Sequence, residues 1–231
     1  MSDNRETHNY LHIPKTGGTA LKYVIDQHNS ANKPQPRIHL PNAGHNQKLA
    51  NMNNACFIVR HPWDRFCSGF WERVTMPQRQ ELSKTKYKDV KGFGYKAYNS
   101  LEEEILDKCK TPDEFLTYIK TGGKTQENTP GLFELTDSIT FWLGNMAQFQ
   151  AHEHKIKSAF HINNMNIAMK KIYNIEMPTD PFKKRSRDLF NIKQSYDISP
   201  ANRVWFEREY RKQDYELIAY IKTRPFFVKD F

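Results

Sequence analysis

A lysine, two glycines and two threonines stand together near the start of the chain, a combination suited to binding a phosphate group. The segment reads His12-Ile-Pro-Lys-Thr-Gly-Gly-Thr19. Glycines let the backbone approach an anion closely, and the first amides of a helix have no acceptor within that helix. We therefore predict that backbone amides and the Lys15 ammonium group bind an anion here. The predicted binding residues are Pro14, Lys15, Thr16, Gly17, Gly18, Thr19 and Ala20.

An arginine and a serine eight positions apart form a second candidate anion site. Arg60 directly follows the apolar run 55–59, and Ser68 lies in the next segment, which is predicted to be helical. A guanidinium group can grip a phosphate with two parallel hydrogen bonds, and a hydroxyl adds another donor. An ion pair with Asp64 is the alternative interpretation of Arg60. Two anion sites in one fold imply a ligand with two phosphate groups, such as a bisphosphorylated nucleotide.

The lysine-containing segment is predicted to connect a strand to a helix. Residues 9–13 form a short extended run that ends at Pro14, and apolar residues follow at helical spacing from Thr19 onward. A second short extended candidate covers residues 37–40. This order, strand then loop then helix, places the candidate anion site at the end of a strand.

The run over 55–59 predicts a central strand, because it is apolar on both faces, as in a strand buried between two helix layers. Pro62 suits the first turn of a helix that runs to about Met76. Alternating strands and helices favour an α/β fold with three layers, in which a mainly parallel central sheet is flanked by helices.

The later part of the chain is predicted to be mainly helical. Thr111-Pro-Asp-Glu114 has the residues of a helix N-cap, with a proline at the first position and a glutamate that closes a capping box. Ser199 opens another helix in the same way, and the helical pattern runs to about Ile221. Residues 77–100 have weak periodicity and an excess of basic side chains, which predicts a mobile basic insertion. We expect one domain over 1–231.

Composition limits the class of protein. The chain has 231 residues, of which 38% are hydrophobic, and a net charge of +9, which favours an anionic partner. Its longest apolar run, 55–59, is far shorter than the roughly 20 residues that cross a bilayer. The polar N-terminus has no signal pattern, so we expect a cytoplasmic protein without a membrane span. The three cysteines have no metal-type spacing and are expected to be reduced packing residues.

Both anion motifs resemble those of the sulfotransferases that use 3′-phosphoadenosine 5′-phosphosulfate. The segment 12–19 is similar to the loop that binds the 5′-phosphosulfate group in that family, and the segment 57–70, with Arg60 and Ser68, is similar to the part that holds the 3′-phosphate. Asn191-Ile-Lys193-Gln-Ser195 resembles the family's late loop, which implies that Lys193 contacts the donor. The resemblance implies a P-loop-like fold.

Two histidines between the anion motifs are candidates for a general base. The segment Arg37-Ile-His39-Leu-Pro resembles the part of the family that carries the base, which implies this role for His39. A histidine near its ordinary pKa of about 6.5 accepts a hydroxyl proton at neutral pH if it lies within hydrogen-bond reach. His45 is the reserve candidate, and a packing role is the alternative for His39.

The activity implied is in-line transfer of the sulfuryl group to a hydroxyl-bearing small molecule or saccharide, with adenosine 3′,5′-bisphosphate as the product and no metal required. Lys15 is predicted to stabilise charge on the leaving oxygen. His152 and His154 are interpreted as solvated side chains, because no third metal ligand is evident. The basic run 183–187 fits a solvated face, a nucleic-acid patch or a cover over the donor.

Two other classes of protein remain as alternatives. A nucleotide kinase or NTPase has its lysine after the last glycine of the loop and a magnesium-binding carboxylate at a strand end, whereas Lys15 precedes Gly17 and the central strand ends in Arg60. A basic nucleic-acid-binding module would account for the charge and not for the two motifs, so a nucleic-acid partner is disfavoured. The acceptor and the oligomeric state are left open.

Overall fold

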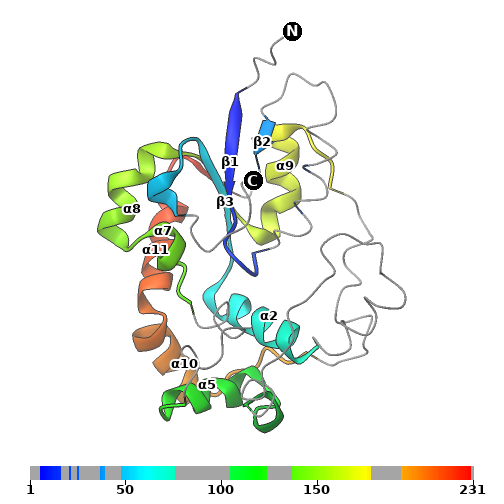
Figure 1. Ribbon diagram of the computed structural model, residues 1–231, viewed down its shortest axis with the longest axis vertical. Coiled ribbons are helices and arrows are strands. Elements are labelled where there is room, and N and C mark those ends of the chain that lie inside the picture. Colours follow the sequence, from blue (N-terminus) through cyan, green and yellow to red (C-terminus); the bar gives the residue numbers. More distant parts are fainter. Residues whose placement is uncertain are drawn as a thin grey trace. The chain divides into compact units, whose positions relative to one another are not determined.

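One parallel sheet organises the described part of the chain. The computed structural model describes residues 6–16, 21, 25, 37–39, 48–75, 105–123, 137–177 and 194–229. Five strands in this part pair in the order β2-β1-β3-β4-β5, and every neighbouring pair is parallel (Figure 1). The strands are β1 (Thr7–Leu11), β2 (Arg37–His39), β3 (Ala55–Val59), β4 (Ile156–His161) and β5 (Phe227–Val228).

Helices cover both faces of this sheet. On one face lie α7 (Thr140–Leu143), α8 (Met146–His152) and α11 (Lys212–Thr223), whose apolar side chains pack against Leu11, Phe57 and Ala159. On the other face lies α9 (Met165–Tyr173), which packs against Tyr10, Ile58 and Phe160. Successive side chains of a strand point to opposite faces, so each strand contributes to both cores. The α/β fold with a parallel sheet flanked by helices is confirmed, and it is consistent with a P-loop-like fold.

The central strand forms where the sequence predicts it. All five residues of β3 are buried, which explains why its apolar run has no polar alternation. The first strand, β1, covers Thr7–Leu11 instead of 9–13. Ile13 is fully buried but lies beyond the ladder, because the chain turns at Pro14–Thr16. Apolar character alone therefore extended the predicted strand too far.

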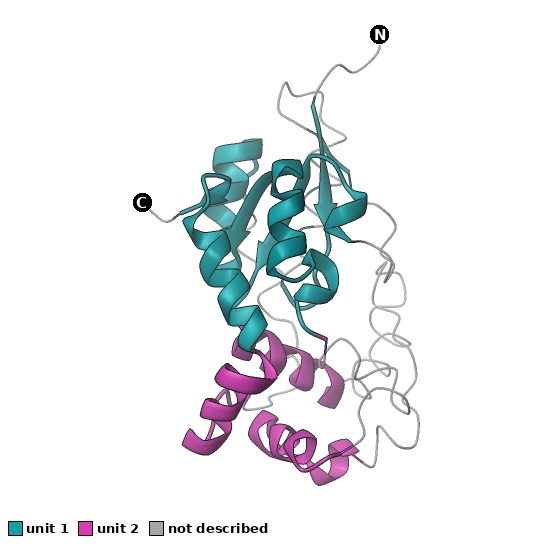
Figure 2. Cartoon of the chain, turned by 90° about the vertical axis from the view of Figure 1, so that its left-hand side faces the viewer, with its two compact units in different colours: residues 1–61, 138–179, 212–231 teal, residues 62–137, 180–211 magenta. Residues whose placement is uncertain are grey.

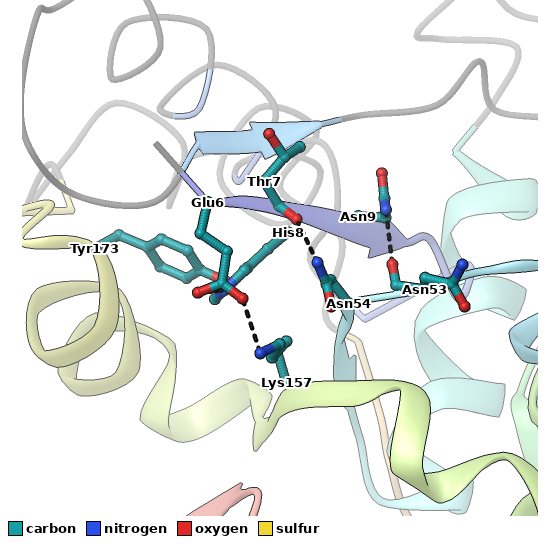
Figure 3. A network of polar contacts seen from close by, with 8 residues as sticks. All are labelled: Glu6, Thr7, His8, Asn9, Asn53, Asn54, Lys157 and Tyr173. Carbon is teal, nitrogen blue, oxygen red and sulfur yellow. Dashed lines mark hydrogen bonds and ion pairs between the residues drawn. The ribbon is translucent and has the colours of Figure 1, made fainter. Parts of the chain in front are cut away.

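Asparagines fix β1 against the turn that precedes β3. The Asn9 amide group donates to the carbonyl oxygen of Asn53 at 2.7 Å, and the Asn9 backbone N–H donates to the carbonyl of Asn54 at 2.9 Å. The Asn54 side chain donates in return to the carbonyl of Thr7 at 3.3 Å (Figure 3). Asn54 has a φ of 52°, a left-handed conformation that asparagine tolerates better than most residues. These bonds set the register in which Asn9 lies opposite Ala55.

The chain divides into two compact units, which are coloured separately in Figure 2. Unit 1 contains residues 1–61, 138–179 and 212–231, and therefore the whole described sheet. Unit 2 contains residues 62–137 and 180–211. The predicted insertion at 77–100 lies outside the described residues, and the single-domain organisation stays a prediction.

Unit 2 has a helical and aromatic core. Its described helices are α2 (Pro62–Val74), α5 (Pro112–Lys120), α10 (Pro200–Trp205) and the π-helix η5 (Phe206–Tyr210). The Phe66 ring lies 5.7 Å from that of Phe115 and 5.5 Å from that of Phe206, measured between centroids, so α2, α5 and η5 share one apolar contact. The start of α2 at Pro62 is as predicted.

Two helix caps predicted from the sequence are present. The Thr111 side chain accepts a hydrogen bond from the Glu114 N–H at the start of α5, and Ser199 accepts one from Asn202 at the start of α10. The Glu114 carboxylate accepts from the backbone N–H of Lys110, one residue earlier than a capping box requires. The predicted helical run after Ser199 is formed by α10, η5 and α11 in succession. In the part of the chain described here, no helix has the length and hydropathy needed to cross a membrane.

Candidate functional site

The turn after β1 has an unusual backbone. The Thr16 hydroxyl donates to the carbonyl oxygen of Ile13 at 2.6 Å, and both residues are fully buried. Between them Lys15 has a φ of 66°, in the left-handed region that residues other than glycine seldom adopt. Pro14 and Lys15 are partly exposed. The Thr16 side chain therefore shapes the turn, while Lys15 remains partly accessible to solvent.

Arg60 lies beside this turn. It follows β3, the neighbour of β1 in the sheet, and its Nη1 donates to the carbonyl oxygen of Lys15 at 3.2 Å. The chain leaves β1 for β2 on one side, and β3 lies on the other side of β1, so the strand order reverses at this point. Open α/β sheets bind ligands outside the carboxyl ends of their strands at such a reversal. The structure thus brings together Lys15 and Arg60, which come from separate motifs.

His39 is set back from this turn along the strand direction. It is the last residue of β2, it is exposed, and it lies opposite Asn9 in the register of β1 and β2. Asn9 precedes Leu11, the last residue of β1, by two residues, about 7 Å at roughly 3.3 Å per strand residue, and the Lys15 turn lies beyond that end. The alternative base, His45, lies outside the described residues, so the choice between the two histidines stays a prediction.

The remaining predicted residues divide into two groups. Ser68 belongs to unit 2, where it lies on α2 and is partly exposed. The others lie outside the described residues, and their roles stay predictions; they are Gly17, Gly18, Thr19, Ala20 and Lys193.

Comparison with known families gives the class of this chain. The model of the sulfotransferase family matches residues 3–137, more than half of the chain, and this stretch includes both Lys15 and Arg60. The chain belongs to the sulfotransferase family. The predicted family is therefore confirmed, and family membership supports sulfotransfer as the general activity. No curated protein and no solved structure matches the sequence significantly.

Two tryptophans hold a late segment of the chain against α2. The Trp63 indole donates to the carbonyl oxygen of Tyr196 at 2.7 Å, and the Trp71 indole donates to that of Ser195 at 2.9 Å. We call these two bonds the tryptophan clamp. The sequence shows two tryptophans eight residues apart, but backbone acceptors more than a hundred residues later leave no local signal. The clamp was therefore missed by sequence reasoning.

A buried polar group lies between the sheet and α9. The Tyr173 hydroxyl and Nδ1 of His8 are 2.9 Å apart, and Glu6, which pairs with Lys157 at 2.8 Å, lies 3.6 Å from Nε2 of His8 (Figure 3). Burial lowers the pKa of His8, since the charged ring would lose hydration. A neutral ring fits the contacts if Nδ1 accepts from the Tyr173 hydroxyl. No pattern in the sequence singles out this histidine.

The three cysteines of the chain are buried and free, as expected. Burial raises the pKa of the Cys56 thiol to about 12, so it stays protonated at neutral pH and is a packing group. In the described ranges, His, Cys, Asp and Glu side chains form no group of three or more that fits a metal ion.

Basic side chains also line a hollow of about 440 Å³ near the ends of β4 and β5. Lys222 and Lys229 supply the charge, and the exposed Lys229 directly follows β5. Like Lys15 and Arg60, Lys229 therefore follows a strand at the carboxyl edge of the sheet in unit 1. Lys229 follows β5, whereas the Lys15 turn follows β1, so a substitution of Lys229 can serve as a control that removes the same charge from another strand end.

Proposed function

We propose that this chain transfers a sulfuryl group from 3′-phosphoadenosine 5′-phosphosulfate to a hydroxyl group of a small molecule or saccharide. The hydrogen bond between Arg60 and the Lys15 carbonyl carries this proposal, because it brings one residue of each candidate anion motif into direct contact. If each motif faced a separate cleft, one nucleotide could not engage both. The family match supports the reaction class, and the resemblance of the two motifs supports the donor. The three buried free thiols support a reducing compartment such as the cytoplasm.

Different residues bind the two ends of the nucleotide in this proposal. Lys15 and the amides of 16–20 bind the 5′-phosphosulfate end, because an ammonium group and the amides of a predicted helix start favour a multiply charged anion. Arg60 and Ser68 bind the 3′-phosphate, and Lys193 adds a further positive charge. Each of these groups donates hydrogen bonds without requiring a bound metal ion.

The transfer step forms one bond to sulfur and breaks another. The acceptor oxygen bonds to sulfur as the bond between sulfur and the 5′-phosphate oxygen breaks, and the acceptor proton passes to a histidine. Negative charge grows on the leaving oxygen, where the Lys15 ammonium group stabilises it. The base is His39 or His45. His39 ends β2, which runs parallel to β1, and His45 lies outside the described residues, so both histidines stay candidates.

Calorimetric titration with adenosine 3′,5′-bisphosphate in magnesium-free buffer tests donor recognition. We expect saturable binding of one nucleotide per chain, weakened about tenfold or more in a Lys15→Ala variant because a charge-assisted contact is lost. Lys229→Ala is the matched control, since it removes the same charge from the same edge, and it should bind almost as wild type does. Preference for ATP with magnesium would indicate the kinase class instead.

Transfer of labelled sulfate from the donor to a panel of saccharides, alcohols and phenols tests the reaction. Lys15→Ala should lower the transfer rate by roughly 10²- to 10³-fold, the usual effect of removing one group that stabilises transition-state charge. A Lys15→Ala enzyme with full activity would contradict the proposed role of this lysine, whatever the acceptor.

A further inference from the structure

One hydrogen bond joins the two motifs, and it acts on the backbone of the first. Arg60 Nη1 donates to the carbonyl oxygen of Lys15, which lies 45 positions earlier in the sequence, and the bond is partly buried. Arg60 therefore contacts the Lys15 turn directly.

The bond reaches the residue of this turn that has the left-handed conformation. Among the described non-glycine residues, φ is positive at Lys15, Asn54 and Asn174. Asparagine is enriched in this conformation because its short amide can bond to the nearby backbone, whereas lysine has no such group. A stabilising contact from elsewhere in the fold is therefore required at Lys15, and the guanidinium group of Arg60 supplies one.

Arg60 also determines how the next peptide group is oriented. The carbonyl of Lys15 and the N–H of Thr16 belong to one planar trans peptide, in which they point in opposite directions. A donor held on that carbonyl fixes the direction of that N–H. The Thr16 hydroxyl is fixed separately by its bond to Ile13. Two contacts thus set the peptide orientation at the start of the anion-binding segment.

The geometry leaves Arg60 donors for a second partner. A guanidinium group has five N–H donors in a rigid fork, and one of them serves the Lys15 carbonyl. We propose that Arg60 is a positioning residue for the Lys15 turn as well as a phosphate contact, so that binding at the 5′ end of the nucleotide depends on Arg60 even when the ligand has no 3′-phosphate. This inference rests on the proposed function.

Two nucleotides that differ only in the 3′-phosphate separate these roles. Calorimetry compares adenosine 3′,5′-bisphosphate with adenosine 5′-monophosphate on the wild type, Arg60→Ala, Arg60→Lys and Lys229→Ala. We expect Arg60→Ala to weaken the bisphosphate about 10- to 100-fold, and the monophosphate still about 3- to 10-fold. Arg60→Lys keeps the charge without the rigid fork, so it should leave the monophosphate weakened. Lys229→Ala measures the effect of losing a distant charge and should change monophosphate affinity less than twofold.

Hydrogen exchange without any ligand gives a readout that does not depend on nucleotide binding. If Arg60 holds the turn, the amides of the peptide 12–20 should exchange about 5- to 10-fold faster in Arg60→Ala than in the wild type. Peptides from α8 and α9 should exchange equally in both proteins, which shows that the variant is folded. Lys229→Ala should exchange as the wild type does throughout.

Three results would overturn the inference: monophosphate affinity unchanged in Arg60→Ala, monophosphate affinity fully restored in Arg60→Lys, or unchanged exchange of the peptide 12–20. Failure of the proposed function is recognised separately, because the wild type would then bind neither nucleotide. The exchange measurement would still decide whether Arg60 positions the turn.

Discussion

His8 shows how the burial of one side chain makes stability depend on pH. Its ring is 5% exposed, and burial lowers its pKa from the ordinary value of 6.5. A base with a lowered pKa in the folded state binds its proton more readily when unfolded. Its contribution to stability is therefore fully present above pH 6.5 and is lost as the pH falls from 6.5 toward the lower folded-state pKa.

A His8→Gln variant tests this link. Glutamine keeps an acceptor for the Tyr173 hydroxyl but does not titrate. Between pH 7.5 and 5.5 we expect the unfolding free energy of the wild type to fall more steeply than that of the variant, by up to about 1.4 kcal/mol per pH unit. Urea unfolding at three pH values measures both slopes, and the difference cancels the other histidines. Equal slopes would show that His8 binds the same number of protons in the folded and unfolded states, which would contradict the prediction.

At the scale of elements, α2 joins a candidate binding residue to a distant segment. Ser68 lies on this helix between Trp63 and Trp71, whose indoles hold the carbonyls of Tyr196 and Ser195. Each bond is worth about 0.5–1.5 kcal/mol, enough to change how often the segment detaches locally without unfolding the whole chain. The clamp therefore sets the local stability of 195–196 against α2.

Replacement of Trp71 by phenylalanine should release this segment. The phenyl ring keeps most of the packing but cannot donate, so hydrogen exchange over 194–199 should rise about 3- to 10-fold. Trp142→Phe is the control, because it makes the same change of ring in the sheet-bearing unit 1, where Trp142 is 2% exposed. If both variants raise exchange over 194–199 equally, lost ring volume and not the clamp is responsible.

For the whole molecule, the net charge of +9 distinguishes two kinds of partner. A nucleic-acid-binding protein that makes six to ten phosphate contacts loses about 10³- to 10⁵-fold in affinity between 50 and 200 mM salt. Binding of one bisphosphorylated nucleotide should lose less than about tenfold over the same range, because fewer counterions are released. Titrations at both salt concentrations, with the bisphosphorylated nucleotide and with an oligonucleotide about 20 nucleotides long, measure the two losses of affinity. Tighter binding of the oligonucleotide at 200 mM salt would favour the nucleic-acid class.

Local sequence signals predicted much of the fold. The five apolar residues of β3, the proline that begins α2 and the hydroxyls that cap α5 and α10 act over a few neighbouring positions, and each was located correctly. The strand β5 has only two residues, too few for any periodicity. Its place beside β4 depends on the ladder and on the packing of α11.

The candidate site was predictable only in part. The residue types at Lys15 and Arg60 are enough to indicate anion binding, because few other roles combine glycines, hydroxyls and these charges. The bond between them is a contact over 45 positions, and no local pattern encodes it. The position of His39 opposite Asn9 likewise follows from the register of β1 and β2, which the sequence alone does not specify.

The asparagine bonds between β1 and the turn before β3 have an effect at the opposite edge of the sheet. A slip of one residue between these strands would exchange the faces of every β1 side chain and displace the Lys15 turn by about 3.3 Å relative to Arg60. That is as long as the hydrogen bond itself. The side chains of Asn9 and Asn54 thus help to keep the Lys15 turn level with Arg60 from the other end of the strands.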